Sequence, residues 1–365
     1  MFDPNVQVRQ NLKDIEPYKP GLSDEQLRKE LGNRPLVKLN SNENTLGPSP
    51  LALRAMEREL PRLHLYPDGG SDLVKAAIAK HHHVQPEQVF VGNGSDDIIK
   101  LLSETFLDEG DEIVTPFPTF SQYTFGAQVM KARVKLAPLR ADFTYDVEAL
   151  LAAVTERTKL LYLCTPNNPT GTVLKQAEFD HLIEHLPDHV LVIVDMAYDN
   201  YATNPERFQF NAGVLRHANV CLLYTFSKLY GLAGLRVGYA IGHPEVFAYV
   251  HRVREPFNVN RIAQVGAIAA LSDVEHVKRS QELVQASRRQ YETLRESGMH
   301  VVPSEANFAL IEVGDGKRVF EALRKQAILV RTGFVGLESY VRVSFGTEAE
   351  NQACIAALRE VVAHA

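Results

Sequence analysis

Four apolar segments of strand length, separated by helical stretches, constrain the fold of this 365-residue chain more than any other feature. A strand that is apolar along its whole length is buried on both faces, which is typical of a mostly parallel sheet covered by helices. The sequence therefore predicts an α/β fold with a large, helix-covered sheet. The segments are DEIVTP (111–116), KLLYLCTP (159–166), HVLVIVDMAY (189–198) and NVCLLYTFS (219–227).

The pattern changes after residue 243. A long helical region is followed by three separated strand candidates, NFALIEV, ILVRTG and YVRVSFG, and by a terminal helix. This arrangement predicts a second, smaller α/β domain that residues of the N-terminal arm join. We expect an N-terminal arm belonging to the small domain (1–45), a large domain (46–270) and a small C-terminal domain (271–365).

Composition excludes several classes of protein. A net charge of −6 argues against a nucleic-acid surface, and the three cysteines form no CxxC pair, which excludes a disulfide framework or zinc ribbon. The N-terminus has no apolar signal-peptide core, and no apolar run reaches the length of a membrane span. We therefore expect a cytoplasmic protein without nucleic-acid or membrane partners. The HHH run at 81–83 indicates a solvated helix end, and we expect no metal site.

Polar residues follow the predicted strands at the points where ligands bind in open α/β sheets, beyond the carboxyl ends. Taken alone, each has an ordinary structural explanation; the GNGSD turn, for example, also fits a simple capped helix start. Together they offer an anion cradle at a helix N-terminus, an amide, a carboxylate, a phenol, a lysine and an arginine. The residues are Gly94, Ser95, Asp96, Asn168, Asp195, Tyr198, Ser227, Lys228 and Arg236.

Lys228 is the most telling of these residues, because a buried strand does not normally end in an ammonium group aimed at the core. The set matches the needs of pyridoxal phosphate (PLP): a lysine for a Schiff base, a carboxylate for the pyridine nitrogen and an anion site. A nicotinamide enzyme would instead need a glycine fingerprint with an acid on the next strand, and that pairing is missing.

The motifs and their order resemble those of fold-type-I PLP-dependent aminotransferases, which have the aspartate-aminotransferase-like fold, and most closely those of the histidinol-phosphate aminotransferase family. The resemblance covers nearly the whole chain, and the lysine segment and the NPTG loop are its most specific parts. The motifs are YKPG (18–21), LNSNENTLGPSP (39–50), YPDGG (66–70), GNGSDD (92–97), PTFSQY (118–123), TPNNPTG (165–171), VDMAY (194–198), TFSKLYGLAGLRVGY (225–239), PFNVN (256–260), ANF (306–308) and VRVSFGT (341–347).

The resemblance implies a role for each candidate. Lys228 would be catalytic, carrying the Schiff base and then moving the proton. Asp195 would pair with the pyridine nitrogen, and Asn168 and Tyr198 would bond the ring oxygen. The other cofactor residues would be Gly94, Ser95, Asp96, Ser227 and Arg236 around the phosphate, Phe120 stacked on the ring, and Tyr66 reaching the cofactor of the neighbouring subunit of a homodimer.

Two arginines indicate where a substrate anion would bind. In YVRVSFG, Arg342 alternates with apolar residues and so points away from the apolar face, and Arg331 ends ILVRTG. A single arginine of this kind is usually just solvated, but two on neighbouring elements of the small domain predict an anion site, since guanidinium groups suit phosphate or carboxylate. The resemblance implies that the pair holds the phosphate of histidinol phosphate, with Tyr18 and Asn168 also at the substrate. Because glutamate must use the same site, the arginines alone leave the main substrate open.

The predicted function is reversible amino-group transfer from L-histidinol phosphate to 2-oxoglutarate, in histidine biosynthesis. An aromatic amino-acid aminotransferase on the same scaffold is the alternative, and a phosphothreonine-type decarboxylase is another. A non-catalytic PLP-binding sensor would need an attached DNA-binding domain, and the acidic chain shows none.

Overall fold

A computed structural model describes residues 7–16, 26, 29, 32, 34–211 and 213–363. Its centre is a seven-stranded sheet with the order β2-β8-β7-β6-β5-β3-β4. Four neighbouring pairs, from β7 across to β4, run parallel, whereas β8 runs antiparallel to β7 and β2. The predicted mostly parallel sheet is confirmed. Its strands are β2 (Val89–Gly92), β3 (Glu112–Phe117), β4 (Arg133–Pro138), β5 (Thr158–Cys164), β6 (Leu191–Asp195), β7 (Val220–Thr225) and β8 (Gly238–Gly242).

The central strands are apolar on both faces because alternate side chains enter two separate cores. Leu161 and Leu163 of β5 join one core, whereas Leu160 and Tyr162 join the other. The first core is covered by α4 (Asp72–His82), α7 (Val147–Ala153), α8 (Gln176–His185) and α10 (Arg261–Leu271). The second core is covered by α5 (Ser95–Phe106), α6 (Gln122–Val129) and α9 (Pro244–Val253).

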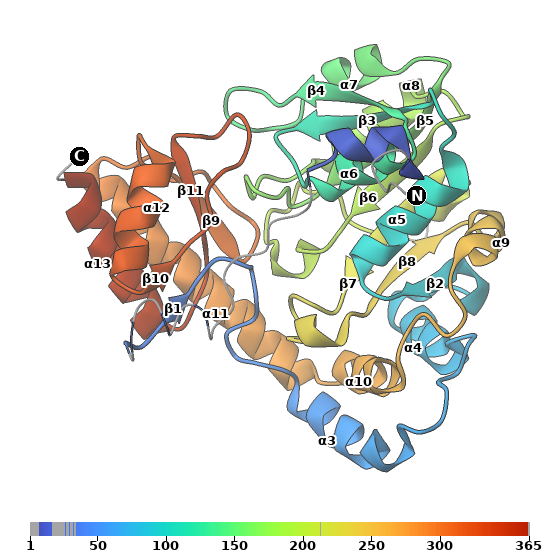
Figure 1. Ribbon diagram of the computed structural model, residues 1–365, viewed down its shortest axis with the longest axis horizontal. Coiled ribbons are helices and arrows are strands. Elements are labelled where there is room, and N and C mark those ends of the chain that lie inside the picture. Colours follow the sequence, from blue (N-terminus) through green and yellow to red (C-terminus); the bar gives the residue numbers. More distant parts are fainter. Residues whose placement is uncertain are drawn as a thin grey trace.

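The C-terminal elements form a second group beside the large sheet (Figure 1). Strand β9 (Phe308–Glu312) pairs antiparallel with β11 (Tyr340–Ser344). Strand β1 (Val37–Lys38) pairs parallel with β10 (Ile328–Leu329), so the chain before the large sheet joins these late elements. Their helices are α11 (Val274–Glu292), α12 (Gly316–Lys325) and α13 (Glu348–Ala363).

The remaining elements are short, apart from α3 (Pro50–Glu59), which lies against α10 at the lower edge of Figure 1. Among the described residues, no helix combines the length and apolarity needed to cross a bilayer. The single-turn and two-turn 3-10 helices are η1 (Gln10–Asp14), η2 (Leu60–Arg62), η3 (Pro86–Gln88), η4 (Asp199–Tyr201), η5 (Val214–Arg216), η6 (Ala233–Leu235) and η7 (Thr293–Ser297).

The histidine run at the end of α4 differs in part from the expected solvated helix end. His81 and His83 are exposed, but the side chain of His82 is half-buried and packs against Tyr224 and Tyr239. Its Nε2 atom lies 2.8 Å from the Tyr239 hydroxyl, and burial lowers the pKa of His82 to about 3. The prediction was wrong for His82, because the adjacent aromatic residues come from strands that are distant in sequence.

Candidate active site

A cavity of about 820 Å³ lies at the carboxyl edge of the large sheet and extends to the β9–β11 pair. Parallel strands β3, β5, β6 and β7 all end at this edge, so the loops that follow them meet here. Eleven of the residues singled out from the sequence line the cavity. They are Ser95, Asp96, Phe120, Asn168, Asp195, Tyr198, Ser227, Lys228, Arg236, Arg331 and Arg342.

Lys228 enters the cavity from the turn that follows β7. Its Nζ atom donates a hydrogen bond to the Ser41 carbonyl at 3.0 Å and lies 5.8 Å from the centre of the Tyr198 ring. Burial, reinforced by the positive charge of Arg342, lowers the pKa of Lys228 to about 8. The lowered pKa increases the uncharged fraction of this amine near neutral pH, which favours its action as a nucleophile or proton acceptor.

Asp195 is the last residue of β6 and is buried on the face covered by α6. One carboxylate oxygen accepts the Tyr123 hydroxyl at 2.8 Å, and the other accepts the Ala197 amide at 3.0 Å. Burial outweighs these donors and raises the pKa of Asp195 to about 6. A cationic N–H group placed in the cavity would stabilise this carboxylate.

Tyr123 was not singled out from the sequence. It lies in the first turn of α6, is fully buried, and stacks on Tyr162 with ring centres 4.7 Å apart. The available signal was its position: PTFSQY directly follows β3, so its tyrosine returns toward the carboxyl edge of the sheet. The pairing itself joins residues 72 apart, which the sequence pattern does not specify.

The N-terminus of α5 forms an anion cradle with Arg236. Arg236 lies 3.4 Å from both the Ser227 hydroxyl and the Asp96 carboxylate. Gly94 precedes the helix with φ of +92°, and a Cβ atom there would lie only 2.7 Å from Arg236 Nη2. Free helix amides and a guanidinium together favour a phosphate group, and the glycine leaves the arginine room to approach.

Asn168 and Tyr198 stand beside the lysine, each oriented by one partner. The Asn168 amide oxygen accepts a hydrogen bond from Arg342, which leaves its NH₂ group as a donor. Asn42 donates to the Tyr198 hydroxyl at 3.0 Å. Both residues can therefore direct a proton toward an acceptor oxygen in the cavity.

Arg331 and Arg342 are neighbours through a bridge in which each backbone N–H bonds the other's carbonyl, at 2.9 and 2.7 Å. Arg342 is buried and Arg331 is half-buried. Arg342 is enclosed because its guanidinium donates to the Asn40 carbonyl at 2.8 Å and lies 5.3 Å from the ring centres of Phe308 and Phe334. Two guanidinium groups thus line one end of the cavity.

Tyr66, a predicted site residue, does not line the cavity of its own chain. Tyr66 is 78% exposed and stacks on Phe257, with ring centres 4.7 Å apart. Tyr18 lies outside the described residues. Their assigned roles remain predictions.

The cavity residues fit PLP in three independent respects. The anion cradle that a Cβ at Gly94 would obstruct suits the phosphate, and the buried acid at Asp195 suits a pyridine N–H. Lys228 lies in the same cavity with a lowered pKa. An α/β sheet that carries such a lysine, acid and anion cradle at its carboxyl edge defines a PLP-dependent enzyme of fold type I.

Comparison with known proteins narrows this class to a family. Residues 34–358 match the family model described as aminotransferase class I and II. The chain belongs to this family, as its motifs predicted. The fold is shared with aspartate aminotransferase of Thermus thermophilus, which is 23% identical with a TM-score of 0.85 over 97% of this chain and 99% of that one.

Several relatives carry one name. A protein of Moorella thermoacetica called histidinol-phosphate aminotransferase is 45% identical over 97% of this chain and 93% of its own. Its namesake in Symbiobacterium thermophilum is 41% identical over 96% and 98%. The crystal structure of histidinol-phosphate aminotransferase from Sinorhizobium meliloti in complex with PLP is 26% identical, with a TM-score of 0.90 over 98% of both chains.

Proposed function

We propose that the protein is a PLP-dependent aminotransferase that moves an amino group between L-histidinol phosphate and 2-oxoglutarate, in histidine biosynthesis. The observation that carries the proposal is the arginine pair at one end of the cavity that holds Lys228. Relatives up to 45% identical over nearly the full length, all named for this reaction, support it. A family of aminotransferases contains many substrates, and the arginine pair together with these relatives favours a phosphorylated donor.

The residues around the cavity have separate tasks in holding the cofactor. Bound PLP supplies an electron sink for the carbon that carries the amino group. The start of α5 and Arg236 would hold its phosphate, and Asp195 would keep its ring nitrogen protonated. Asn168 and Tyr198 would donate to its ring oxygen, and Phe120 would pack against the ring.

Lys228 moves the proton in this reaction. Its Nζ atom would take the proton from the amine-bearing carbon of the substrate and deliver it to the cofactor carbon that receives the amino group. The lowered pKa of Lys228, about 8, suits this task because a general base works best with a pKa near the working pH.

The arginine pair selects an anionic donor. Arg331 and Arg342 together provide enough donors for a phosphate monoester, whose charge two guanidinium groups offset. Arg342 is already oriented by Asn168 and Asn40, so it requires little ordering when the substrate binds. The α-carboxylate of glutamate would bind to the same pair in the second half of the cycle.

An aromatic amino-acid donor is the second candidate. The observation in its favour is an apolar wall of the cavity that includes Leu136, Val335 and Phe334, the last of which contacts Arg342. A wall of this kind accepts an imidazole or a phenyl ring alike, whereas a pair of arginines suits a doubly charged phosphate ester better than a single carboxylate.

The proposal is tested by comparing kcat/KM for L-histidinol phosphate and unphosphorylated L-histidinol. The wild type should prefer the phosphate ester by at least about a hundredfold, and Arg331→Gln should reduce that preference by about tenfold or more. Arg318→Gln, an exposed arginine on α12, is the control and should keep it. A wild type that uses both donors equally would refute phosphate recognition and favour the aromatic candidate.

We also propose that two chains form a homodimer with shared active sites, in which Tyr66 reaches the neighbouring cofactor. Support comes from an exposed apolar surface around α3 and η2 that includes Leu60, Leu63, Leu65 and Tyr66.

We further propose the domain limits expected from the sequence, which the pairing of β1 with β10 supports. A cytoplasmic location fits three free cysteines, all buried.

A further inference from the structure

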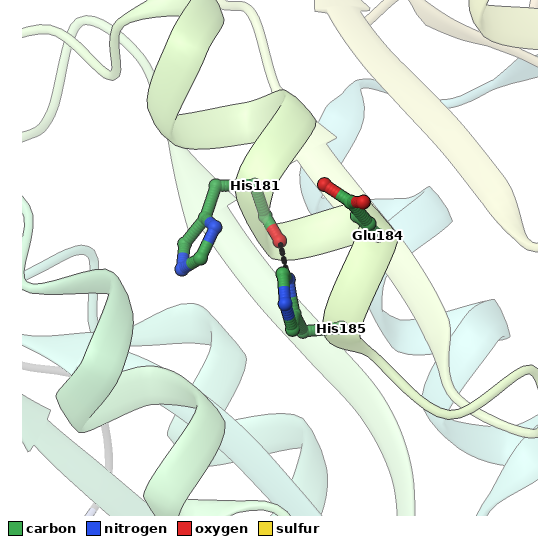
Figure 2. A group of neighbouring side chains, drawn as sticks. All are labelled: His181, Glu184 and His185. Atoms are coloured by element: carbon green, nitrogen blue, oxygen red, sulfur yellow. Dashed lines mark hydrogen bonds between the residues drawn. The ribbon is translucent and has the colours of Figure 1, made fainter.

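An exposed group of metal-ligating side chains lies on α8, outside the cavity. His181, Glu184 and His185 each offer one ligand atom, and these atoms lie within 4.8 Å of one another. Residues four apart share one face of a helix, and the two imidazole ring centres are 4.4 Å apart. Figure 2 shows both rings beside each other, with the Glu184 carboxylate on the same turn of the helix.

The hydrogen bonds of the two histidines fix which nitrogen of each ring is available. His185 Nδ1 lies 2.9 Å from the His181 carbonyl oxygen, which can only accept, so Nδ1 carries the proton and Nε2 keeps its lone pair. His181 Nε2 lies 2.8 Å from a Glu148 carboxylate oxygen, so its Nδ1 keeps the lone pair. This is the outer-shell arrangement that orients histidine ligands of metals, a carboxylate or carbonyl bonded to the other ring nitrogen.

We propose that His181, His185 and Glu184 bind one divalent transition-metal ion of the zinc, nickel or copper type. Two imidazoles and one carboxylate match the ligand preference of these ions, whereas magnesium and calcium prefer oxygen ligands alone. The side chains are exposed, so small rotations can bring the donors to the roughly 2.0–2.2 Å that such ions require. Water molecules would complete the coordination shell.

The Glu148 carboxylate, contributed by α7, has two effects on this site. Bonded to His181 Nε2, it holds the ring in the ligating tautomer and adds a negative charge close to the ion. Neither α7 nor α8 contributes a residue to the wall of the cavity. Binding of the ion should therefore leave the aminotransferase reaction unchanged.

The test is isothermal titration calorimetry of the untagged, cofactor-loaded full chain with ZnCl₂, NiCl₂ and MgCl₂. We expect one zinc or nickel ion per chain and no binding of magnesium. His181→Gln and His185→Gln should each weaken zinc binding more than tenfold, and Glu148→Gln about tenfold. His189→Gln, a histidine just beyond the end of α8, is the matched control and should bind zinc like the wild type.

Two results would overturn the proposal. One is wild-type zinc binding no stronger than that of the His181→Gln/His185→Gln double variant, which would place any bound ion elsewhere, for example at His81 and His83. The other is the loss of transamination in that double variant at normal thermal stability, since the site is outside the cavity. Substitutions at these exposed positions should leave the fold intact, and circular dichroism checks this.

Discussion

The buried carboxylate of Asp195 lowers the stability of the folded protein at neutral pH. Its folded-state pKa of about 6 lies above the ordinary value of 3.8, because burial disfavours the charged form. The folded protein thus holds this proton more tightly than the unfolded chain does. The resulting contribution to stability is present below about pH 4, is lost as the pH rises through 6, and stays lost above it.

Replacing Asp195 by Asn should therefore stabilise the cofactor-free protein at neutral pH while it impairs transamination severely. The gain in melting temperature should shrink as the pH falls from about 7.5 toward 4.5, where the wild-type acid is protonated. Thermal unfolding of both cofactor-free proteins across this range measures the effect. A variant that is less stable than the wild type at pH 7.5 would contradict the assigned cost of the buried charge.

Tyr123 is a positioning residue, which acts through Asp195. Tyr123→Phe removes a donor that stabilises the Asp195 carboxylate, so the pKa of Asp195 should rise further. We expect kcat to fall about tenfold and the acidic limb of its pH profile to move to higher pH. Tyr162→Phe, on the ring stacked against Tyr123, is the control for packing alone. An unshifted acidic limb in Tyr123→Phe would limit this tyrosine to a packing role.

Sequence reasoning singled out eleven residues that line the cavity, because the chemistry of their side chains identifies them. A lysine, an acid and an arginine at strand ends can be identified as candidate site residues without coordinates, because burying an unpaired charge is costly. The burial of Arg342 could not be read from the sequence, because it depends on Asn40 and two phenylalanines distant in sequence. Tyr123 was missed because a fully buried tyrosine looks like any core aromatic.

At the scale of elements, the backbone conformation of the turn before α5 controls how closely Arg236 approaches the anion cradle. Gly94→Ala places a methyl group against Arg236 at a position with positive φ. Cofactor affinity should fall at least about tenfold, with a loss of about 1 kcal/mol in the free energy of unfolding. Equilibrium dialysis and denaturant unfolding measure these two quantities separately.

Gly110→Ala is the matched control for that strain. Gly110 has φ of +89°, close to that of Gly94, but a Cβ atom there meets nothing within 4 Å. The Gly110→Ala variant should lose a similar amount of free energy of unfolding and keep its affinity for the cofactor. Equal cofactor loss in both variants would show that Gly94 matters for folding and not for the cradle.

Two strands of the large sheet, β8 and β4, have no counterpart among the strands predicted from the sequence. Strand β8 begins and ends with glycine, and in β4 at the sheet edge only Ala137 is buried. Both depend on pairing with neighbours, which single-sequence patterns reflect only weakly. Strand β1, two residues long, is defined only by its distant partner β10.

At the scale of the whole molecule, the account predicts active sites shared between two chains. Tyr66 is exposed on the surface beside Phe257 and Arg261 and does not line the cavity of its own chain. A hybrid of Lys228→Ala and Tyr66→Ala chains would contain one fully wild-type site if Tyr66 acts across the interface. Neither parent variant contains such a site.

Mixing and re-folding the two variants should restore about a quarter of wild-type activity, since half of the dimers are hybrids with one intact site each. The test compares the transaminase activity of the mixed sample with the summed activities of the two parent variants. Activity no higher than that sum, in a sample shown by mass to contain hybrid dimers, would place Tyr66 outside the neighbouring site.

The central claim is that the cavity accepts L-histidinol phosphate as an amino donor. The most direct measurement follows the visible absorption of the cofactor-loaded protein during separate titrations with L-histidinol phosphate, L-phenylalanine and L-glutamate. The account predicts loss of the yellow band at low concentrations of histidinol phosphate, loss with glutamate, and a much weaker response to phenylalanine. Loss with phenylalanine and glutamate but not with histidinol phosphate would contradict it and would identify an aromatic aminotransferase.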